Sequence, residues 1–71
     1  MTLTEIKKTA FAKWLMLNSR VAAKQHLWEC LHSGPSDSMA WDLLEAVYGE
    51  KRLPSPLGPA LNKCLDALAG K

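Results

Sequence analysis

The sequence predicts an all-α protein in which one long N-terminal helix and two short helices form a single domain that pairs as a homodimer. Three observations support this fold class. No glycine or proline occurs before Gly34, the apolar residues of the later segments recur at helical spacing, and no segment alternates apolar and polar residues as a half-buried strand would. A chain of 71 residues is also too short for more than one domain, so residues 1–71 are taken together.

The first helix is predicted over residues 3–33. Thr2 and Glu5 stand three positions apart, which is the spacing of a capping box, and the segment is rich in good helix formers. Its main apolar stripe comprises Leu3, Ile6, Ala10, Trp14, Leu17, Val21, Trp28 and Leu31. Apolar residues also lie on two other sides, so that a single neighbouring helix cannot cover this one.

A turn is predicted at residues 34–38, where Gly34, Pro35 and three residues with N-capping side chains follow one another. The second helix is expected over residues 39–48, with Gly49 as its C-terminal stop. Its apolar side comprises Ala40, Leu43, Leu44 and Val47.

Residues 50–59 contain three of the four prolines and cannot continue a helix, because each proline ring removes a hydrogen-bond donor. A third helix is expected over residues 57–69. Its apolar positions have the spacing of an amphipathic helix and are Leu57, Leu61, Cys64, Leu65 and Leu68.

The length of the first helix is the argument for a dimer. A straight helix over residues 3–33 would measure roughly 46 Å, whereas a domain of this size has a diameter of about 30 Å. We therefore expect the helix to project and to be covered by a second copy, and the residues expected at that interface are Ala10, Trp14, Leu17, Val21 and Trp28. The alternative is a monomeric bundle in which the helix breaks at Asn18–Ser19.

Composition points to a cytoplasmic location. The net charge is only +2, the N-terminus lacks the order of a secretory signal, and the longest apolar run, residues 14–17, is far too short for a membrane span. Cys30 and Cys64 are the only cysteines. Their wide separation favours two reduced thiols over a disulfide scaffold.

The sequence carries no motif of an enzyme, a cofactor site or a metal centre. The four glycines are scattered and no serine has the setting of a nucleophile. His26, Cys30, His32 and Cys64 are the soft metal ligands of the chain, but the two histidines point about 120° apart on a helix, which does not suit one tetrahedral centre. We expect neither catalysis nor a bound metal or cofactor.

The remaining expectation is a role in protein binding. Aromatic residues concentrate in protein interfaces, and the surface expected to meet an outside partner comprises Trp41, Tyr48, Lys51, Arg52 and Leu53. In size and in its lack of catalytic motifs, the chain resembles the small accessory proteins of phages and other mobile elements that occupy a surface of a larger bacterial host protein. We expect a homodimer that modulates or inhibits such a protein.

The alternative function is a DNA-binding or nucleoid-associated transcriptional regulator. On a continuous first helix, Lys13, Arg20 and Lys24 would lie close together and could line a phosphate backbone. The second helix, however, carries Asp42 and Glu45 and has no residue of the types that read bases.

Overall fold

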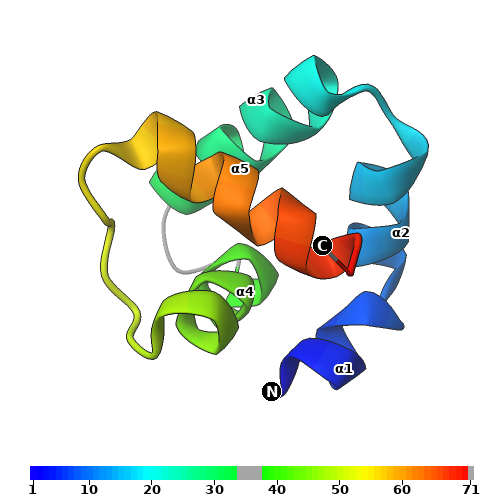
Figure 1. The fold of residues 1–71 in the computed structure, drawn as a ribbon, viewed down its shortest axis with the longest axis horizontal. Coiled ribbons are helices and arrows are strands. Elements are labelled where there is room, and N and C mark those ends of the chain that lie inside the picture. Colours follow the sequence, from blue (N-terminus) through cyan, green and yellow to red (C-terminus); the bar gives the residue numbers. More distant parts are fainter. Residues whose placement is uncertain (34–37, 71) are drawn as a thin grey trace.

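Five helices make up the part of the chain that the computed structural model describes, residues 1–33 and 38–70. They are α1 (Leu3–Lys7), α2 (Ala10–Leu17), α3 (Arg20–His32), α4 (Ser38–Tyr48) and α5 (Leu57–Leu68). In Figure 1, α5 crosses the centre of the molecule, with α3 above it, α4 below it, and α1 and α2 to one side. Helix α5 contacts each of the other four helices. The described residues are therefore all-helical, as predicted, and contain no strand.

The single helix predicted for residues 3–33 is wrong, because the chain interrupts it twice. Between α1 and α2, the Thr9 hydroxyl donates to the carbonyl of Ile6 at 2.6 Å and accepts from the amide of Ala12 at 3.2 Å. Between α2 and α3, the Ser19 hydroxyl accepts from the amide of Ala22 at 3.2 Å. Each hydroxyl satisfies an amide that would otherwise lack a partner at the start of a helix, so each break is capped.

The breaks let the N-terminal half fold back onto the rest of the chain. The molecule measures 24 × 24 × 23 Å, with a radius of gyration of 10.7 Å, so that an unbroken helix would extend far beyond it. The alternative break at Asn18–Ser19 is confirmed, and a second one occurs at Lys8–Thr9. The length argument for a dimer no longer holds, since no helix projects from the described fold.

The other predicted elements are confirmed to within a residue. Thr2 and Glu5 form the capping box that begins α1, and Gly49, at φ +84°, follows the last residue of α4 in a conformation that favours glycine. Helices α4 and α5 match the ranges expected for them. The predicted turn falls almost entirely at residues 34–37, which lie outside the described residues.

One hydrophobic core joins all five helices. Its largest side chains are apolar and come from every element, and those almost fully buried are Ile6, Leu15, Leu27, Leu43, Leu44, Cys64 and Leu65. No polar or charged residue is buried in the described part of the chain. None of its helices combines the length and the apolar character needed to cross a membrane.

Candidate functional site

The residues expected at a self-association interface all lie on the surface of the folded chain. The exposed fractions are 43% for Trp14, 85% for Leu17, 75% for Val21 and 47% for Trp28, and Ala10 is exposed as well. Single exposed apolar side chains are common on folded proteins, whereas several that lie together mark interaction sites. The fold leaves these side chains available to a partner.

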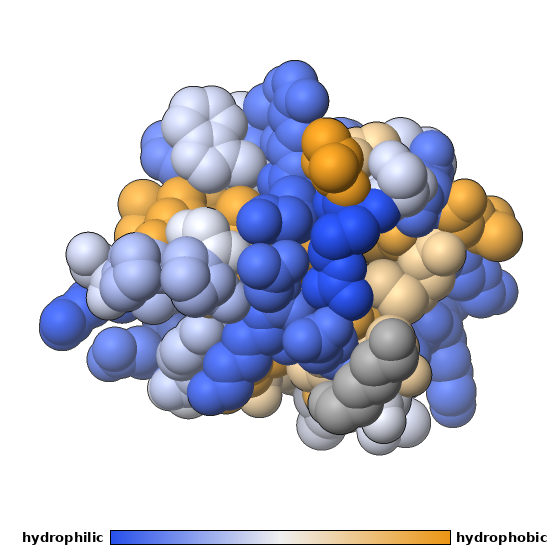
Figure 2. Space-filling view, turned by 45° about the horizontal axis from the view of Figure 1, so that its top comes forward, coloured by the Kyte–Doolittle hydropathy of each residue, from blue (hydrophilic) through white to orange (hydrophobic). Residues whose placement is uncertain are grey.

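The break at Asn18–Ser19 divides these residues between two helices instead of forming one continuous seam. Ala10, Trp14 and Leu17 occupy the side of α2 away from its buried residues Ala12 and Leu15. Figure 2 shows that hydrophilic side chains cover the middle of one face of the molecule, with separate apolar groups around them.

The outward side of α3 carries its own exposed row, which we call the α3 outer stripe. Its members follow one another at intervals of four, three and four residues and are Val21, Gln25, Trp28 and His32. The Trp28 and His32 rings stack with their centroids 4.1 Å apart, and His32 Nδ1 lies 2.8 Å from the Trp28 carbonyl oxygen. The stack holds the exposed indole against its own helix, which lowers the entropy that a partner would have to remove on binding.

A second aromatic cluster joins α2 to α3. The ring of His26 lies 4.5 Å from that of Trp14 and 5.9 Å from that of Phe11, between centroids. Its Nε2 atom is 3.6 Å from Cys30 Sγ. Helical spacing already placed His26 and Cys30 on one side of a helix, but the contact of His26 with α2 depends on the break at Asn18–Ser19 and was missed.

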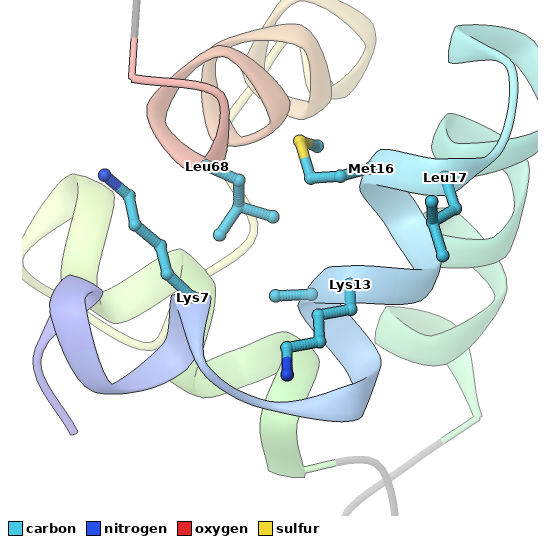
Figure 3. Close-up of a pocket in the computed structure, with 6 residues that line it drawn as sticks. Lys7, Lys13, Met16, Leu17 and Leu68 are labelled. Atoms are coloured by element: carbon cyan, nitrogen blue, oxygen red, sulfur yellow. The ribbon is translucent and has the colours of Figure 1, made fainter.

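Sequence reasoning also missed an apolar hollow between α1, α2 and α5. It has a volume of about 310 Å³ and is lined by Lys7, Ala12, Lys13, Met16, Leu17 and Leu68. In Figure 3, the Leu68 side chain points into the hollow from α5, while the Lys7 and Lys13 side chains lie on different sides of it. We call this feature the α1–α2–α5 hollow.

The surface expected to meet an outside partner is partly engaged within the chain. Trp41 and Tyr48 are half-buried and pack against the core, and Lys63 Nζ lies 4.8 Å from the centre of the Tyr48 ring. Lys51 pairs with Asp42 at 3.2 Å, and Arg52 lies 3.9 Å from a Glu50 carboxylate oxygen. Leu53 is exposed.

The three basic residues of the alternative function lie on two separate helices. Lys13 belongs to α2, whereas Arg20 and Lys24 belong to α3. Arg20 Nη2 pairs with Asp66 of α5 at 2.7 Å, and Lys24 is half-buried. The three residues therefore do not share the face of one continuous helix.

Cys64 does not have the setting of a reactive thiolate, and no metal centre appears in the described residues. Cys30 and Cys64 are both buried, and burial raises the pKa of the Cys64 thiol to about 11, with a smaller opposing effect from Lys63. Within residues 1–33 and 38–70, no three histidine, cysteine or acidic side chains gather closely enough to hold a metal ion.

Comparison with known proteins adds no functional assignment. The chain matches no protein-family model, no curated protein and no solved structure.

Proposed function

We propose that this protein is a non-enzymatic, protein-binding regulator that pairs with a second copy of itself and docks on a larger protein. The observation that carries the proposal is the exposure of Trp14, Leu17, Val21 and Trp28 by the chain's own fold. Apolar side chains of this size are stabilised when a partner removes them from water, and aromatic residues are enriched at protein interfaces.

We assign self-association to the α3 outer stripe. In a twofold dimer both subunits contribute the same patch. A patch with several like charges would therefore face the same charges on the second copy, which would oppose dimer formation. The α3 outer stripe contains no lysine, arginine or carboxylate, and its Trp28 side chain is held in place by His32. Four side chains on one helix cover less than the roughly 800 Å² that each partner buries in a standard interface. We therefore expect a weak dimer that dissociates on dilution.

Docking on a different protein is assigned to the outward side of α2. Leu17 is the most exposed large apolar residue described, and Lys7 and Lys13 lie beside it at the α1–α2–α5 hollow. A symmetric pair built on this side would bring the lysines of two copies into one interface, which opposes self-association there. By size and by the lack of a catalytic motif, we place the chain among the small modulators and inhibitors of bacterial host proteins that phages and other mobile elements encode.

Sedimentation velocity over a range of protein concentrations tests the self-association. We expect the wild type to shift from monomer towards dimer as concentration rises, and Val21→Glu to remain monomeric because it places two carboxylates in the interface. The matched control is Leu53→Glu, which makes the same kind of change at another exposed apolar position. A wild type that stays monomeric, or a Leu53→Glu variant that dissociates equally, would contradict the assignment.

The Leu17→Glu variant distinguishes an interface formed by α3 alone from the continuous α2 and α3 interface that the sequence predicted. If α3 alone forms the interface, Leu17→Glu keeps the dimer. If α2 and α3 act as one surface, Leu17→Glu dissociates it as fully as Val21→Glu does.

The structure gives no specific observation in favour of the DNA-binding alternative. Arg20 donates to Asp66 and to the carbonyl of Asn62, so that its guanidinium already has partners within the chain. The alternative stays a prediction, and binding of random duplex DNA measured against salt tests it, because phosphate contacts give a steep salt dependence.

A further inference from the structure

We infer that the α1–α2–α5 hollow binds an acidic segment of a partner protein, with one apolar side chain of that segment entering the hollow between Lys7 and Lys13. This inference rests on the proposed function, because it names the chemistry of the partner that docks on α2. It does not depend on the proposed self-association, which involves the α3 outer stripe and a second copy of the chain.

The lining of the hollow suits an apolar side chain. Its volume of about 310 Å³ is at the lower end of the roughly 300 to 1,000 Å³ that small-molecule sites occupy. Ala12 and Leu68 are buried, whereas Met16 and Leu17 are exposed at its walls. An inserted apolar group would therefore meet carbon and sulfur atoms and cover Met16 and Leu17, which the folded chain leaves in water.

The charge at the hollow selects an acidic partner. Among the described residues, neither Lys7 nor Lys13 forms an ion pair, and the ion pairs that are present lie elsewhere, on α3, α4, α5 and the segment that follows α4. Glu5, the carboxylate of α1, accepts from the backbone amide of Thr2 at 3.0 Å and contacts its hydroxyl at 3.1 Å. Within residues 1–33 and 38–70 the two lysines therefore have no ion-pair partner, and carboxylates on either side of an apolar anchor would supply one.

Other anionic partners fit this arrangement less well. Phosphates of duplex DNA would pair with the lysines but would leave the apolar lining exposed to water, since phosphate contacts carry no apolar group. An acidic peptide supplies both kinds of contact in one segment, in the way that amphipathic segments dock in apolar grooves.

The probe for this inference is a fluorescein-labelled amphipathic peptide with leucines along one side and glutamates flanking them, titrated with the full-length protein and followed by polarisation. Two peptides with the same leucines carry glutamine or lysine in place of glutamate. We expect the glutamate peptide to bind at least about tenfold more tightly than the other two, with affinity falling as salt screens the pairs. Equal binding of the glutamine peptide would overturn the charge argument.

Charge reversal locates the site. The double variant Lys7→Glu/Lys13→Glu should lose at least about tenfold in affinity for the glutamate peptide and gain affinity for the lysine peptide. Lys8→Glu is the matched control, because Lys8 is an exposed neighbour that does not line the hollow, and it should change affinity by less than about threefold. An equal loss in Lys8→Glu, or no loss in the double variant, would overturn the assignment.

The apolar contribution is tested by Met16→Gln, which keeps both lysines and lies at an exposed position. It should weaken the glutamate peptide, whereas Leu53→Gln, at an exposed position away from the hollow, should not. Far-UV circular dichroism confirms that each variant is folded. Equal binding by Met16→Gln and wild type would overturn the insertion of an apolar side chain.

Two further titrations test whether the anionic ligand of the hollow is a lipid surface or a nucleic acid instead of an acidic peptide. Vesicles containing phosphatidylglycerol and random duplex DNA are titrated under the same conditions. If either binds more tightly than the glutamate peptide and loses that binding in the double variant, the hollow belongs to a lipid or nucleic-acid surface and the inference is overturned. Sedimentation of the protein without peptide reports on the α3 outer stripe, so failure of this inference is distinguishable from failure of the proposed self-association.

Discussion

Arg20 and Asp66 join the start of α3 to α5 through an ion pair of 2.7 Å between Nη2 and Oδ1. The same guanidinium donates through Nη1 to the carbonyl oxygen of Asn62 at 3.2 Å. This two-pronged contact lies immediately after the break at Asn18–Ser19 and links residues that are 46 positions apart in sequence. It ties the start of α3 to α5.

Removing the guanidinium should cost a modest amount of stability. Both side chains are nearly half exposed, so solvent weakens the ion pair, and we expect Arg20→Ala to lower the free energy of unfolding by about 0.5 to 1 kcal/mol. Arg20→Lys should recover only part of this loss, because an ammonium cannot reach both acceptors in the same planar geometry. Urea unfolding of these variants and of Asp66→Ala in a double-mutant cycle measures the coupling, and a coupling of zero would contradict the link.

Leu15 and Leu17 form a matched pair on α2, because they are two residues apart and differ only in burial. Leu15 is 1% exposed, whereas Leu17 is 85% exposed. We expect Leu15→Ala to lower the free energy of unfolding by about 2 to 5 kcal/mol, and Leu17→Ala to change it by less than about 0.5 kcal/mol. Denaturant unfolding of both variants gives the comparison. Similar losses at the two positions would mean that α2 does not present the side described.

The Thr9 hydroxyl closes α1 and begins α2. Thr9→Ala leaves the amide of Ala12 without this acceptor and should cost about 1 kcal/mol of the free energy of unfolding. Thr9→Ser retains the hydroxyl and should keep most of that stability, which makes it the control. If the alanine and serine variants were equally stable, the cap at Thr9 would be of no consequence.

Cys64 makes stability depend on pH above neutrality. Burial raises the pKa of its thiol from 9.0 to about 11, so the folded state holds the proton more tightly than the unfolded chain does. Its contribution is fully present below pH 9 and is lost as pH rises towards 11. The difference in unfolding free energy between wild type and Cys64→Ala should therefore shrink over this interval. A difference that stays constant would show that the folded thiol titrates normally.

The predictable parts of the fold are those encoded by strong local signals. Gly49 stops α4, Pro54 and Pro56 precede α5, and the apolar spacing from Leu57 to Leu68 identifies the buried side of α5. Each signal acts within a few residues and has few competing interpretations. The same is true of the capping box of Thr2 and Glu5.

Local signals in residues 3–33 do not decide between one unbroken helix and three shorter helices. Every residue there tolerates a helix, and the side-chain N-caps at the breaks are the hydroxyls of Thr9 and Ser19. Such caps contribute about 1 kcal/mol each, which is small beside the burial of Ile6, Ala12 and Leu15 that becomes available when the chain folds back. Tertiary packing decides between one helix and three.

The candidate sites, like the two breaks, depend on tertiary packing and not on local spacing. The fold exposes Trp14, Leu17, Val21 and Trp28, but their spacing did not set them apart from the core, because Ile6 and Leu31 of the same predicted stripe are buried. The α1–α2–α5 hollow could not be foreseen, since it needs α5 to pack beside α1 and α2, as the position of Leu68 in Figure 3 illustrates. No local pattern relates Lys7 and Lys13 to Leu68.

The most direct test of the proposed function uses the indole signals of the three tryptophans in ¹H–¹⁵N spectra recorded at rising protein concentration. Trp28 belongs to the exposed α3 outer stripe, whereas Trp41 is half-buried against the core. We predict concentration-dependent shifts of the Trp28 indole and of the Val21 and Gln25 amides, with Trp41 unchanged. A spectrum that does not change up to millimolar concentration, or shifts centred on Trp41, would contradict the account.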